Sequence, residues 1–506
     1  MERSLQRLGF TVIKNATANV VRGGATAIVA LTLPHFLTRA LDHDRFAAWA
    51  LMLQVASYVG YLDFGIQTAI ARYLAQTVER GDDEQRDRLV STAFVMLLAA
   101  GTLALLLFSL VAWQLPRIVH GVPVGLMGEL RSGIIIMAAS VALLLPMSTY
   151  TGILIGLHRN EFPALAIGGS RILGALAVIV SAKYTHSLIW FAICLAITNL
   201  LGALVQYRFV RKLLPKLRLA LVHVTSGMLA ELARYCSGLT VFSFAMLLVS
   251  GLDVFIVGHF NFNGVGYYAI AATVVTLFAG LSNSCFNAMM TPVAVLQERG
   301  QYGQIADLII KATRLSSYAS LVLTLSAPIY GRYLLRVWVG GSYEAAALPV
   351  LEILLCAQAI RLLGNGYTIA LVGTGHQNYA IGGALAEGIS NLVLSLIGAI
   401  WLGPMGVALG TLFGAVIGIL WMLFFTMRWA SIIPVSVRTF SEEALLRPLL
   451  CLAPLGIYVM FLAHKSFMRL DAAYLLLACT LSVVLSLRWG KVLTKSLFQP
   501  QNRVAS

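Results

Sequence analysis

The sequence predicts an all-α polytopic membrane protein with about 14 transmembrane helices, arranged as two parallel six-helix bundles plus an appended helix pair. Of its 506 residues, 59% are hydrophobic and only 11% are charged, whereas a soluble protein carries about 25% charged residues. Apolar segments recur from residue 16 to residue 489. Each is about 18 residues or longer, which is enough to cross the hydrocarbon core of a bilayer.

An internal repeat predicts the two bundles. The segment LDFGIQTAIARYLAQTVERG at 62–81 is matched without a gap by LSNSCFNAMMTPVAVLQERG at 281–300, a displacement of 219 residues. Only matches in predicted loops are informative, because paired alanines and leucines mean little in so apolar a chain. Since the period encloses six predicted spans, an even number, both copies have the same orientation in the membrane. The loop matches pair Glu79, Arg80, Gly81, Arg117 and Gly121 with Glu298, Arg299, Gly300, Arg336 and Gly340.

The repeat and the loops divide the chain into four parts. We expect an N-terminal six-helix bundle at 1–209, a basic cytoplasmic linker at 210–234, a C-terminal six-helix bundle at 235–427, and appended helices 13 and 14 with a cytoplasmic tail at 428–506. The basic residues among leucines in the linker predict an amphipathic segment on the inner leaflet, and a simple basic tether explains them nearly as well. The charged stretch that ends near residue 90 is expected to be a solvated loop.

The charge distribution predicts the orientation. Two thirds of the 36 Lys and Arg residues fall in predicted loops on the side of the N-terminus, and a quarter fall on the other side. This asymmetry follows the positive-inside rule and places both termini in the cytoplasm. The net charge of +15 therefore indicates contact with anionic lipid rather than with nucleic acid. The basic N-terminal segment shows no cleavable signal peptide, so the first span is expected to be retained. The six cysteines lie in apolar segments and predict neither disulfides nor a metal site.

Polar residues share one face of several predicted spans. In the first span Asn15, Asn19, Arg22 and Thr26 are spaced by four, three and four residues, which places them on one helical face. The second and eighth spans, which the repeat relates to each other, carry similar stripes. We therefore expect a polar path at the interface between the halves. The eighth-span stripe consists of Thr276, Gly280, Asn283, Asn287 and Thr291.

Three arginines lie inside predicted spans, where a charged residue costs about 2.5–3.5 kcal/mol to insert. They are Arg22, Arg171 and Arg361. With Asn19, Gln358 and Asn365 they predict a cationic cavity that binds phosphate groups, because a guanidinium makes bidentate, charge-assisted hydrogen bonds and stays protonated. Structural ion pairs would explain the same arginines, for example Arg171 with Glu387 or Arg361 with Glu352.

Carboxylates in the spans indicate a second kind of site. Asp253 has hydroxyl residues on its side of the helix and, with Glu352, Glu387 and Asn391, is a candidate coupling-ion site for Na⁺ or H⁺. A capped structural aspartate is the alternative. Near the cytoplasmic end of the second span, Asp63 and Arg72 are expected to form a gate or a structural pair.

The opening of the chain resembles a known family. Over residues 15–80 it has an asparagine-bearing first helix with Leu33-Pro34 near its end. The aromatic Trp49 next to a small residue follows, and then Asp63-Phe64-Gly65. With the number of spans and the two-half layout, these features make the chain similar to bacterial polysaccharide transporters. These are the O-antigen and exopolysaccharide repeat-unit flippases of the multidrug/oligosaccharidyl-lipid/polysaccharide exporter superfamily.

The resemblance implies a multi-pass protein of the bacterial inner membrane that is not an enzyme. Its expected activity is the movement of undecaprenyl-diphosphate-linked oligosaccharide repeat units from the cytoplasmic to the periplasmic leaflet, by alternating access, for cell-surface polysaccharide biosynthesis. The expected partners are this lipid-linked oligosaccharide, membrane lipid, and the polysaccharide polymerase and chain-length proteins. No cofactor is implied apart from Na⁺ or H⁺ as a coupling ion.

Three alternatives stay open. A lipid II flippase for peptidoglycan also has fourteen spans, but here Arg22 is followed by Gly23-Gly24 rather than by the arginine-aspartate pattern of those proteins. A cation-coupled drug antiporter of the same superfamily would use carboxylates such as Asp253. A polytopic glycosyltransferase would use the DxD motif Asp42-His43-Asp44, although the predicted outer loops are too short for its active site.

Overall fold

The computed structural model describes residues 23–462 and 470–488, and this part of the chain contains helices and no strand. Arg22 and Asn19 lie outside the described residues. Eleven helices are long and apolar enough to cross a membrane. The helix over residues 23–40, the broken helix formed by α2, η1 and α3, and the C-terminal α18 complete the fourteen predicted spans. The prediction of an all-α polytopic fold is confirmed.

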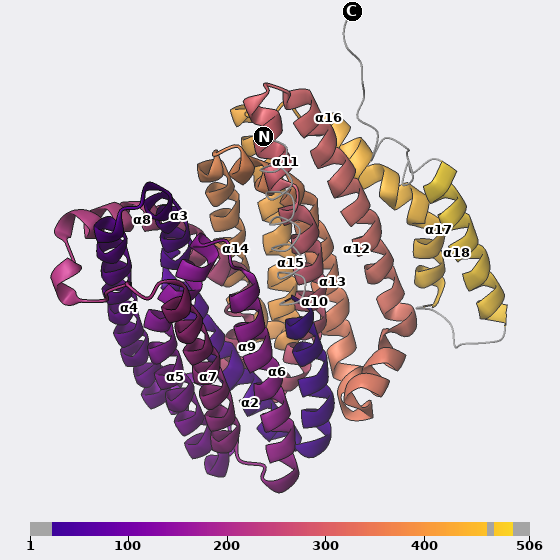
Figure 1. The fold of residues 1–506 in the computed structure, drawn as a ribbon. Coiled ribbons are helices and arrows are strands. Elements are labelled where there is room, and N and C mark those ends of the chain that lie inside the picture. The colour runs from indigo at the N-terminus through magenta and orange to yellow at the C-terminus, as the bar shows by residue number, and fades with distance from the viewer. Residues whose placement is uncertain (1–22, 463–469, 489–506) are drawn as a thin grey trace, which may run out of the picture.

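The first half of the chain forms one group of helices. After the helix at 23–40, it consists of α2 (His43–Ser57), η1 (Tyr58–Asp63), α3 (Ile66–Arg80), α4 (Asp83–Ile118), α5 (Val124–Gly156), α6 (Glu161–Tyr184) and α7 (Leu188–Leu213). The α5 helix packs against α4 and α7, and α6 packs against α7. In Figure 1 α4, α5 and α7 lie together on the left.

Most helices of the second group lie on the other side in Figure 1, whereas α8 begins beside α3 on the left. There α12 packs on α13, and α13 and α14 pack on α15. The elements are η2 (Leu221–His223), α8 (Ser226–Ser250), α9 (Asp253–Phe260), η3 (Phe262–Gly264), α10 (Val265–Asn287), α11 (Met290–Glu298), α12 (Tyr302–Val339), α13 (Gly341–Gly373), α14 (Gln377–Leu402), α15 (Pro404–Trp421) and the π-helix η4 (Met422–Ala430).

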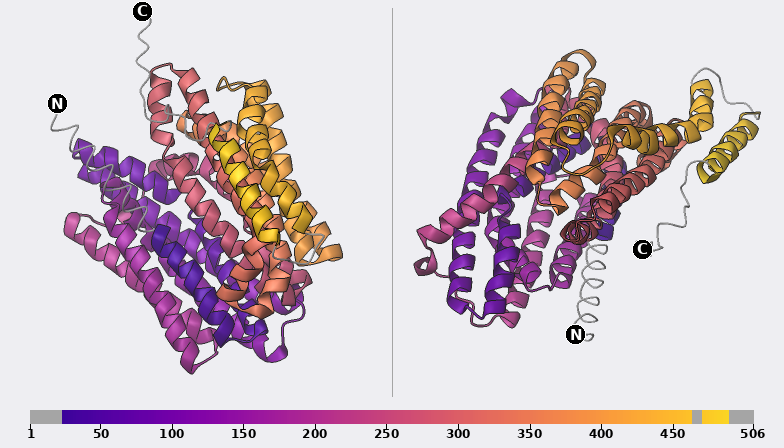
Figure 2. Two further views of the ribbon diagram at one scale, coloured as in Figure 1. Left: turned by 90° about the vertical axis from the view of Figure 1, so that its right-hand side faces the viewer. Right: turned by 90° about the horizontal axis from the view of Figure 1, so that it is seen from above.

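The C-terminal helices form an appended pair. A continuous helical segment contains α16 (Val437–Phe440), the π-helix η5 (Ser441–Leu446) and α17 (Arg447–Leu462), and α18 (Leu470–Arg488) follows. The α17 helix packs against α12 and α18. Figure 2 shows α17 and α18 at the edge of the molecule, away from α4 and α5.

The repeated loop residues mark equivalent turns. The α4 helix begins at Asp83 and α12 at Tyr302, again 219 residues apart. The glycine two residues earlier is in the left-handed region in both copies, with φ of 70° at Gly81 and 69° at Gly300. Glycine adopts this conformation without the steric cost that other residues incur, which explains why the sequence keeps it at both turns.

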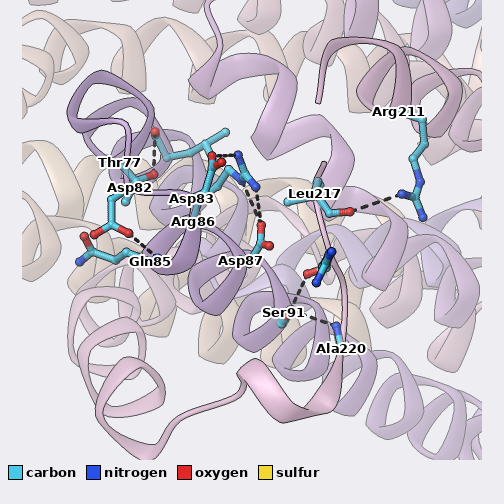
Figure 3. Close-up of polar contacts among 12 residues, drawn as sticks. Thr77, Asp82, Asp83, Gln85, Arg86, Asp87, Ser91, Arg211, Leu217 and Ala220 are labelled. Atoms are coloured by element: carbon cyan, nitrogen blue, oxygen red, sulfur yellow. Dashed lines mark hydrogen bonds and ion pairs between the residues drawn. The ribbon is translucent and has the colours of Figure 1, made fainter. Parts of the chain in front are cut away.

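The charged stretch before residue 90 is a helix start, so the predicted solvated loop is wrong. Asp82 caps α4 by accepting a hydrogen bond from the Gln85 amide at 2.8 Å. Arg86 is only 5% exposed and donates to Asp87 at 2.8 Å and also to Asp83 (Figure 3). Acidic residues in the first turn favour the helix because its N-terminus carries partial positive charge.

The connection between the halves is also shorter than predicted. The α7 helix continues to Leu213 and α8 begins at Ser226, and only η2 lies between them. The segment is fastened to the first half: the Ser91 hydroxyl of α4 donates to Arg218 O at 3.4 Å and accepts from the Ala220 amide at 3.3 Å (Figure 3). Leu217 is buried. The segment between α7 and α8 thus packs on α4 with η2 as its one short helical turn, and its contact with the inner leaflet stays a prediction.

Candidate functional site

The two halves meet firmly at the end of the bundle opposite the linker. We call the contact of His35, Arg39 and Trp338 the opposite-end contact. His35 Nδ1 lies 2.7 Å from Trp338 O, and Arg39 donates to Trp338 O at 3.2 Å and to Val337 O at 3.0 Å. The Trp338 indole donates to Leu31 O at 2.7 Å. These bonds satisfy carbonyls at the C-terminus of α12 that have no partner inside the helix.

Aromatic packing beside this contact closes the same end. His43 Nε2 lies 2.7 Å from Asn263 O, and the His43 ring packs on Tyr267 and Tyr343 with centroid distances of 4.6 and 5.4 Å. Asp42 caps α2 by accepting from the Arg45 amide at 2.7 Å. The DxD motif is thus a helix start with its histidine packed between the halves.

At the end that carries the linker, which we call the basic end, α8 lies against α3. The Arg72 guanidinium is 5.2 Å from the centre of the Tyr235 ring, a cation–π contact. Asp63 instead accepts from the Gly65 amide at 2.9 Å. Asp63 and Arg72 therefore do not form the structural pair that the sequence allowed. Their role as a gate stays a prediction.

The polar stripe of the eighth span is exposed. Thr276, Gly280, Asn283 and Asn287 of α10 are all exposed, and the Asn365 amide of α13 donates to Asn283 Oδ1. Exposed amides inside a membrane-spanning helix are costly against hydrocarbon. This face of α10 is therefore best explained by contact with an aqueous path.

The described arginines that were predicted to line a cationic cavity have different surroundings. Arg171 of α6 is exposed and donates to Thr26 Oγ1 of the first helix at 2.5 Å, so it does not pair with Glu387. Arg361 of α13 forms an ion pair with Glu387 of α14, with 2.6 Å between Nε and Oε1. The side chains of Arg361 and Glu387 are 21% and 13% exposed. Arg361 is therefore neutralised by Glu387, and the alternative pairing with Glu352 is wrong.

Arg361 and Asn391 also donate hydrogen bonds to backbone carbonyls that are left free where the helix breaks between α8 and α9. A helix break frees backbone carbonyls that must find other donors inside a membrane. Asn391 Nδ2 donates to Val249 O at 2.7 Å and lies 3.3 Å from Leu248 O. Arg361 donates to Val249 O at 3.4 Å and to Gln358 Oε1 at 3.4 Å. Gln358 itself is buried beside the ion pair.

Directly after the break lies a buried oxygen-rich cluster around Asp253, which is 7% exposed. Its Oδ2 accepts from the Tyr268 hydroxyl at 3.1 Å and from the Thr411 hydroxyl at 3.2 Å, and its Oδ1 lies 3.4 Å from Asn391 Nδ2. The Ser395 hydroxyl contacts Asn391 Oδ1 at 2.9 Å. Two predicted members of the coupling-ion site, Asp253 and Asn391, are thus brought together.

The other two predicted members lie elsewhere. Glu387 is held by Arg361. Glu352 makes no hydrogen bond or ion pair with any residue that the structure describes. Within the same described ranges there is no group of three or more His, Cys, Asp or Glu residues that could hold a metal ion. A cation at Asp253 would have to be bound mainly by hydroxyl, amide and carbonyl oxygens.

Sequence reasoning missed Tyr268 and Thr411 as partners of Asp253. Each lies on a different helix, α10 and α15, and neither has a spacing to Asp253 that helical periodicity can detect. Ser395 follows Asn391 by four residues on α14, and this spacing was the one available signal for the cluster.

Comparison with solved structures gives the fold. The structure titled lipid II flippase MurJ, inward closed conformation, matches with a TM-score of 0.69 at 14% identity, covering 94% of this chain and 98% of that one. An inward-facing multidrug resistance MATE family transporter of the MOP superfamily matches with a TM-score of 0.64 at 14% identity, covering 83% of this chain and 99% of that one. A MOP superfamily transporter from Pyrococcus furiosus matches at 14% identity with a TM-score of 0.53, covering 83% and 96%.

Comparison by sequence gives the family. No curated protein matches the chain. The sequence model of the family described as polysaccharide biosynthesis protein matches residues 12–295, which is more than half of the chain. This agrees with the resemblance found in residues 15–80 and extends it into the second copy of the repeated segment. The chain is a member of the polysaccharide biosynthesis protein family and has the fold of MOP-superfamily transporters.

Proposed function

We propose that the protein is a flippase that moves undecaprenyl-diphosphate-linked oligosaccharide repeat units from the cytoplasmic to the periplasmic leaflet of the bacterial inner membrane. The basic end faces the cytoplasm, with both termini on that side. Its product serves cell-surface polysaccharide biosynthesis, such as O-antigen or exopolysaccharide, and the polymerase and chain-length proteins act next. The family match over residues 12–295 is the observation that carries the proposal.

The contacts between the halves support alternating access. At the opposite end, Arg39, His35 and Trp338 join the first helix to α12. Toward the basic end, α10 exposes Asn283 and Asn287. A polar path closed at one end is one of the two states that rocking of two bundles requires.

The charges support a division of roles between the halves. Arg171 is an exposed cation of the first half, and Arg22 is predicted on the first helix. In the second half, Arg361 is neutralised by Glu387, and the buried Asp253 has no such ion-pair partner among the described residues. We assign the binding of the diphosphate to the first half, where arginine can make charge-assisted bonds to phosphate oxygens.

The second half is the candidate for coupling to Na⁺. A hard cation prefers oxygen ligands, and Asp253, Tyr268 and Thr411 hold carboxylate and hydroxyl oxygens within one buried cluster. The single hydrogen of the Thr411 hydroxyl can go to Val407 O at 3.1 Å, which turns an oxygen lone pair toward Asp253. Asn391 turns its Nδ2 toward Asp253. These oxygens make Na⁺ one candidate coupling ion, and a proton on Asp253 is the alternative.

A lipid II flippase is the second candidate. The MurJ structure covers 94% of this chain, whereas the MATE structure covers 83%. The greater coverage favours a flippase architecture over a drug antiporter. It does not choose between an oligosaccharide repeat unit and lipid II as the cargo.

The experiment is a transport assay with three cargoes. The purified chain is reconstituted into vesicles with fluorescent undecaprenyl-diphosphate oligosaccharide, lipid II or a cationic dye. The proposal requires that the oligosaccharide leaves its protected leaflet faster than lipid II does, and that the dye is not taken up. Preference for lipid II would assign the protein to peptidoglycan synthesis, and dye transport driven by Na⁺ would assign it to drug export.

A further inference from the structure

We propose that the cavity between η4 and η5 binds the headgroup phosphate of an anionic membrane phospholipid. This cavity of about 560 Å³ is lined by residues of the turn from η4 into α16. The α16 helix lies at the basic end (Figure 1). Its polar lining consists of two arginines and three serines: Arg428, Arg438, Ser431, Ser436 and Ser441. The site lies beside the appended pair and is separate from the polar face of α10, so it does not depend on the proposed transport function.

The charge of the cavity is positive. Arg428 is exposed and has no hydrogen bond or ion pair with any residue in the described ranges. Arg438 pairs through Nε with Glu442 at 2.8 Å, and its two terminal nitrogens stay available. The other nearby acid, Glu443, is held by Arg314 and Arg447 at 2.9 and 2.8 Å. Arginine with hydroxyl donors is the combination that suits a phosphate group.

Aromatic residues place the cavity at the depth of lipid headgroups. Trp421, Phe425 and Trp429 follow each other at four-residue spacing, and the Phe425 ring lies 4.5 Å from Trp421 and 6.2 Å from Trp429. Trp429 is 80% exposed. Exposed tryptophans on a spanning helix mark the membrane–water interface. A phosphate bound here would therefore belong to a lipid in the basic-end leaflet.

The backbone on both sides of the cavity is unusual in the same way. The helix that enters it is a π-helix over Met422–Ala430, and the helix that leaves it is a π-helix over Ser441–Leu446. The π-helix is rare and is found mostly as single turns at functional sites. Both π-helical segments contribute lining residues, among them Arg428 and Ser441.

The consequence is a lipid that stabilises the junction of the appended pair. The η5 segment contacts both α12 and α17, so a headgroup held between η4 and η5 would link the second half to the appended helices. We infer that anionic phospholipid raises the stability of this junction, whereas zwitterionic phospholipid does not. Two basic side chains near a lipid surface favour the anionic headgroup by a factor of about ten or more.

The test is lipid-dependent thermal unfolding of the full chain in detergent. The unfolding temperature is measured during titration with phosphatidylglycerol, phosphatidylcholine or inorganic phosphate. The double variant Arg428→Gln/Arg438→Gln is compared with the matched control Arg80→Gln/Arg299→Gln. Both control arginines are exposed at the basic end, and neither has a side-chain partner in the described part of the chain. The variant Arg428→Lys/Arg438→Lys is a second control, because it changes both side chains but keeps both positive charges.

The expected result is an apparent affinity for phosphatidylglycerol that is about tenfold weaker in the glutamine variant and unchanged in the control. The lysine variant should keep most of the response, and phosphatidylcholine should have none. Equal phosphatidylglycerol responses in the glutamine variant and the control would overturn the proposal. So would an equal shift with inorganic phosphate, which indicates a soluble anion, or displacement of phosphatidylglycerol by undecaprenyl phosphate, which indicates a cargo site.

Discussion

Arg361 and Glu387 form an ion pair between α13 and α14, and the same arginine donates to Val249 O at the break between α8 and α9. Three helices of the second half therefore depend on one guanidinium. A lone arginine at this depth would attract phosphate, but a paired arginine that completes a broken helix is mainly structural. The ion pair thus assigns Arg361 to the charges that hold the second half together.

The stability losses from removing the two partners of this pair should not be additive. We expect Glu387→Gln to lower the free energy of unfolding by about 3 kcal/mol, because it leaves Arg361 partly buried without its counter-charge. Arg361→Gln should cost a similar amount. The double variant should cost less than the sum of the two, since the residues act as a unit. Thermal unfolding in detergent measures all three, and additive losses would contradict the pairing.

Sodium should stabilise the protein through Asp253. If Na⁺ binds the folded state alone, a concentration ten times its dissociation constant adds about 1.4 kcal/mol. We expect NaCl, compared with choline chloride, to raise the unfolding temperature of the wild type and of the control Glu352→Gln, since Glu352 makes none of the hydrogen bonds of the cluster. Asp253→Asn and Thr411→Val should abolish the difference. A Na⁺ response that persists in Asp253→Asn would place the ion elsewhere.

The opposite-end contact should control access to the path. Arg39→Ala removes hydrogen bonds from a charged donor, each contributing about 1.5–3 kcal/mol, so the opposite end should open more often. The probe is Asn287→Cys in a chain whose native cysteines are replaced. An impermeant maleimide added on that side should label it about ten times faster in the Arg39→Ala background.

The matched control for this experiment is Arg45→Ala. Arg45 lies at the same end and donates to His186 O at 2.6 Å, but both residues belong to the first half. Its loss should leave the labelling rate unchanged. Equal acceleration by both variants would show that general loosening, rather than the contact between halves, exposes residue 287.

The sequence was most informative where one helix carries the whole pattern. The exposed polar face of α10 follows from Thr276, Gly280, Asn283 and Asn287 at helical spacing. Gly81 and Gly300 mark equivalent turns because both turns require a positive φ, which glycine adopts without steric cost. Contacts between different helices were harder to predict from the sequence. Helical periodicity does not fix how helices rotate against each other, so it could not choose Glu387 over Glu352 as the partner of Arg361.

The close approach of Gly65 and Leu239 should set the packing of α8 against α3. Gly65 has a φ of 75°, and a Cβ there would lie 2.7 Å from Leu239 Cδ1. Gly65→Ala therefore adds a steric clash to the cost of a left-handed alanine, which is about 1–2 kcal/mol. Gly81→Ala is the matched control, because its φ is 70° and nothing lies within 4 Å of a Cβ.

We expect Gly65→Ala to lower the free energy of unfolding by at least about 1 kcal/mol more than Gly81→Ala, given the usual cost of overpacking. Leu239→Ala should remove only part of the excess in the double variant, because it deletes Cδ1 at 2.7 Å but keeps the Leu239 Cβ at 2.8 Å from the added methyl group. If the two glycine variants are equally destabilised, the contact between α3 and α8 is loose. If Leu239→Ala restores part of the stability but slows transport, this contact also holds the basic end in the conformation that accepts cargo.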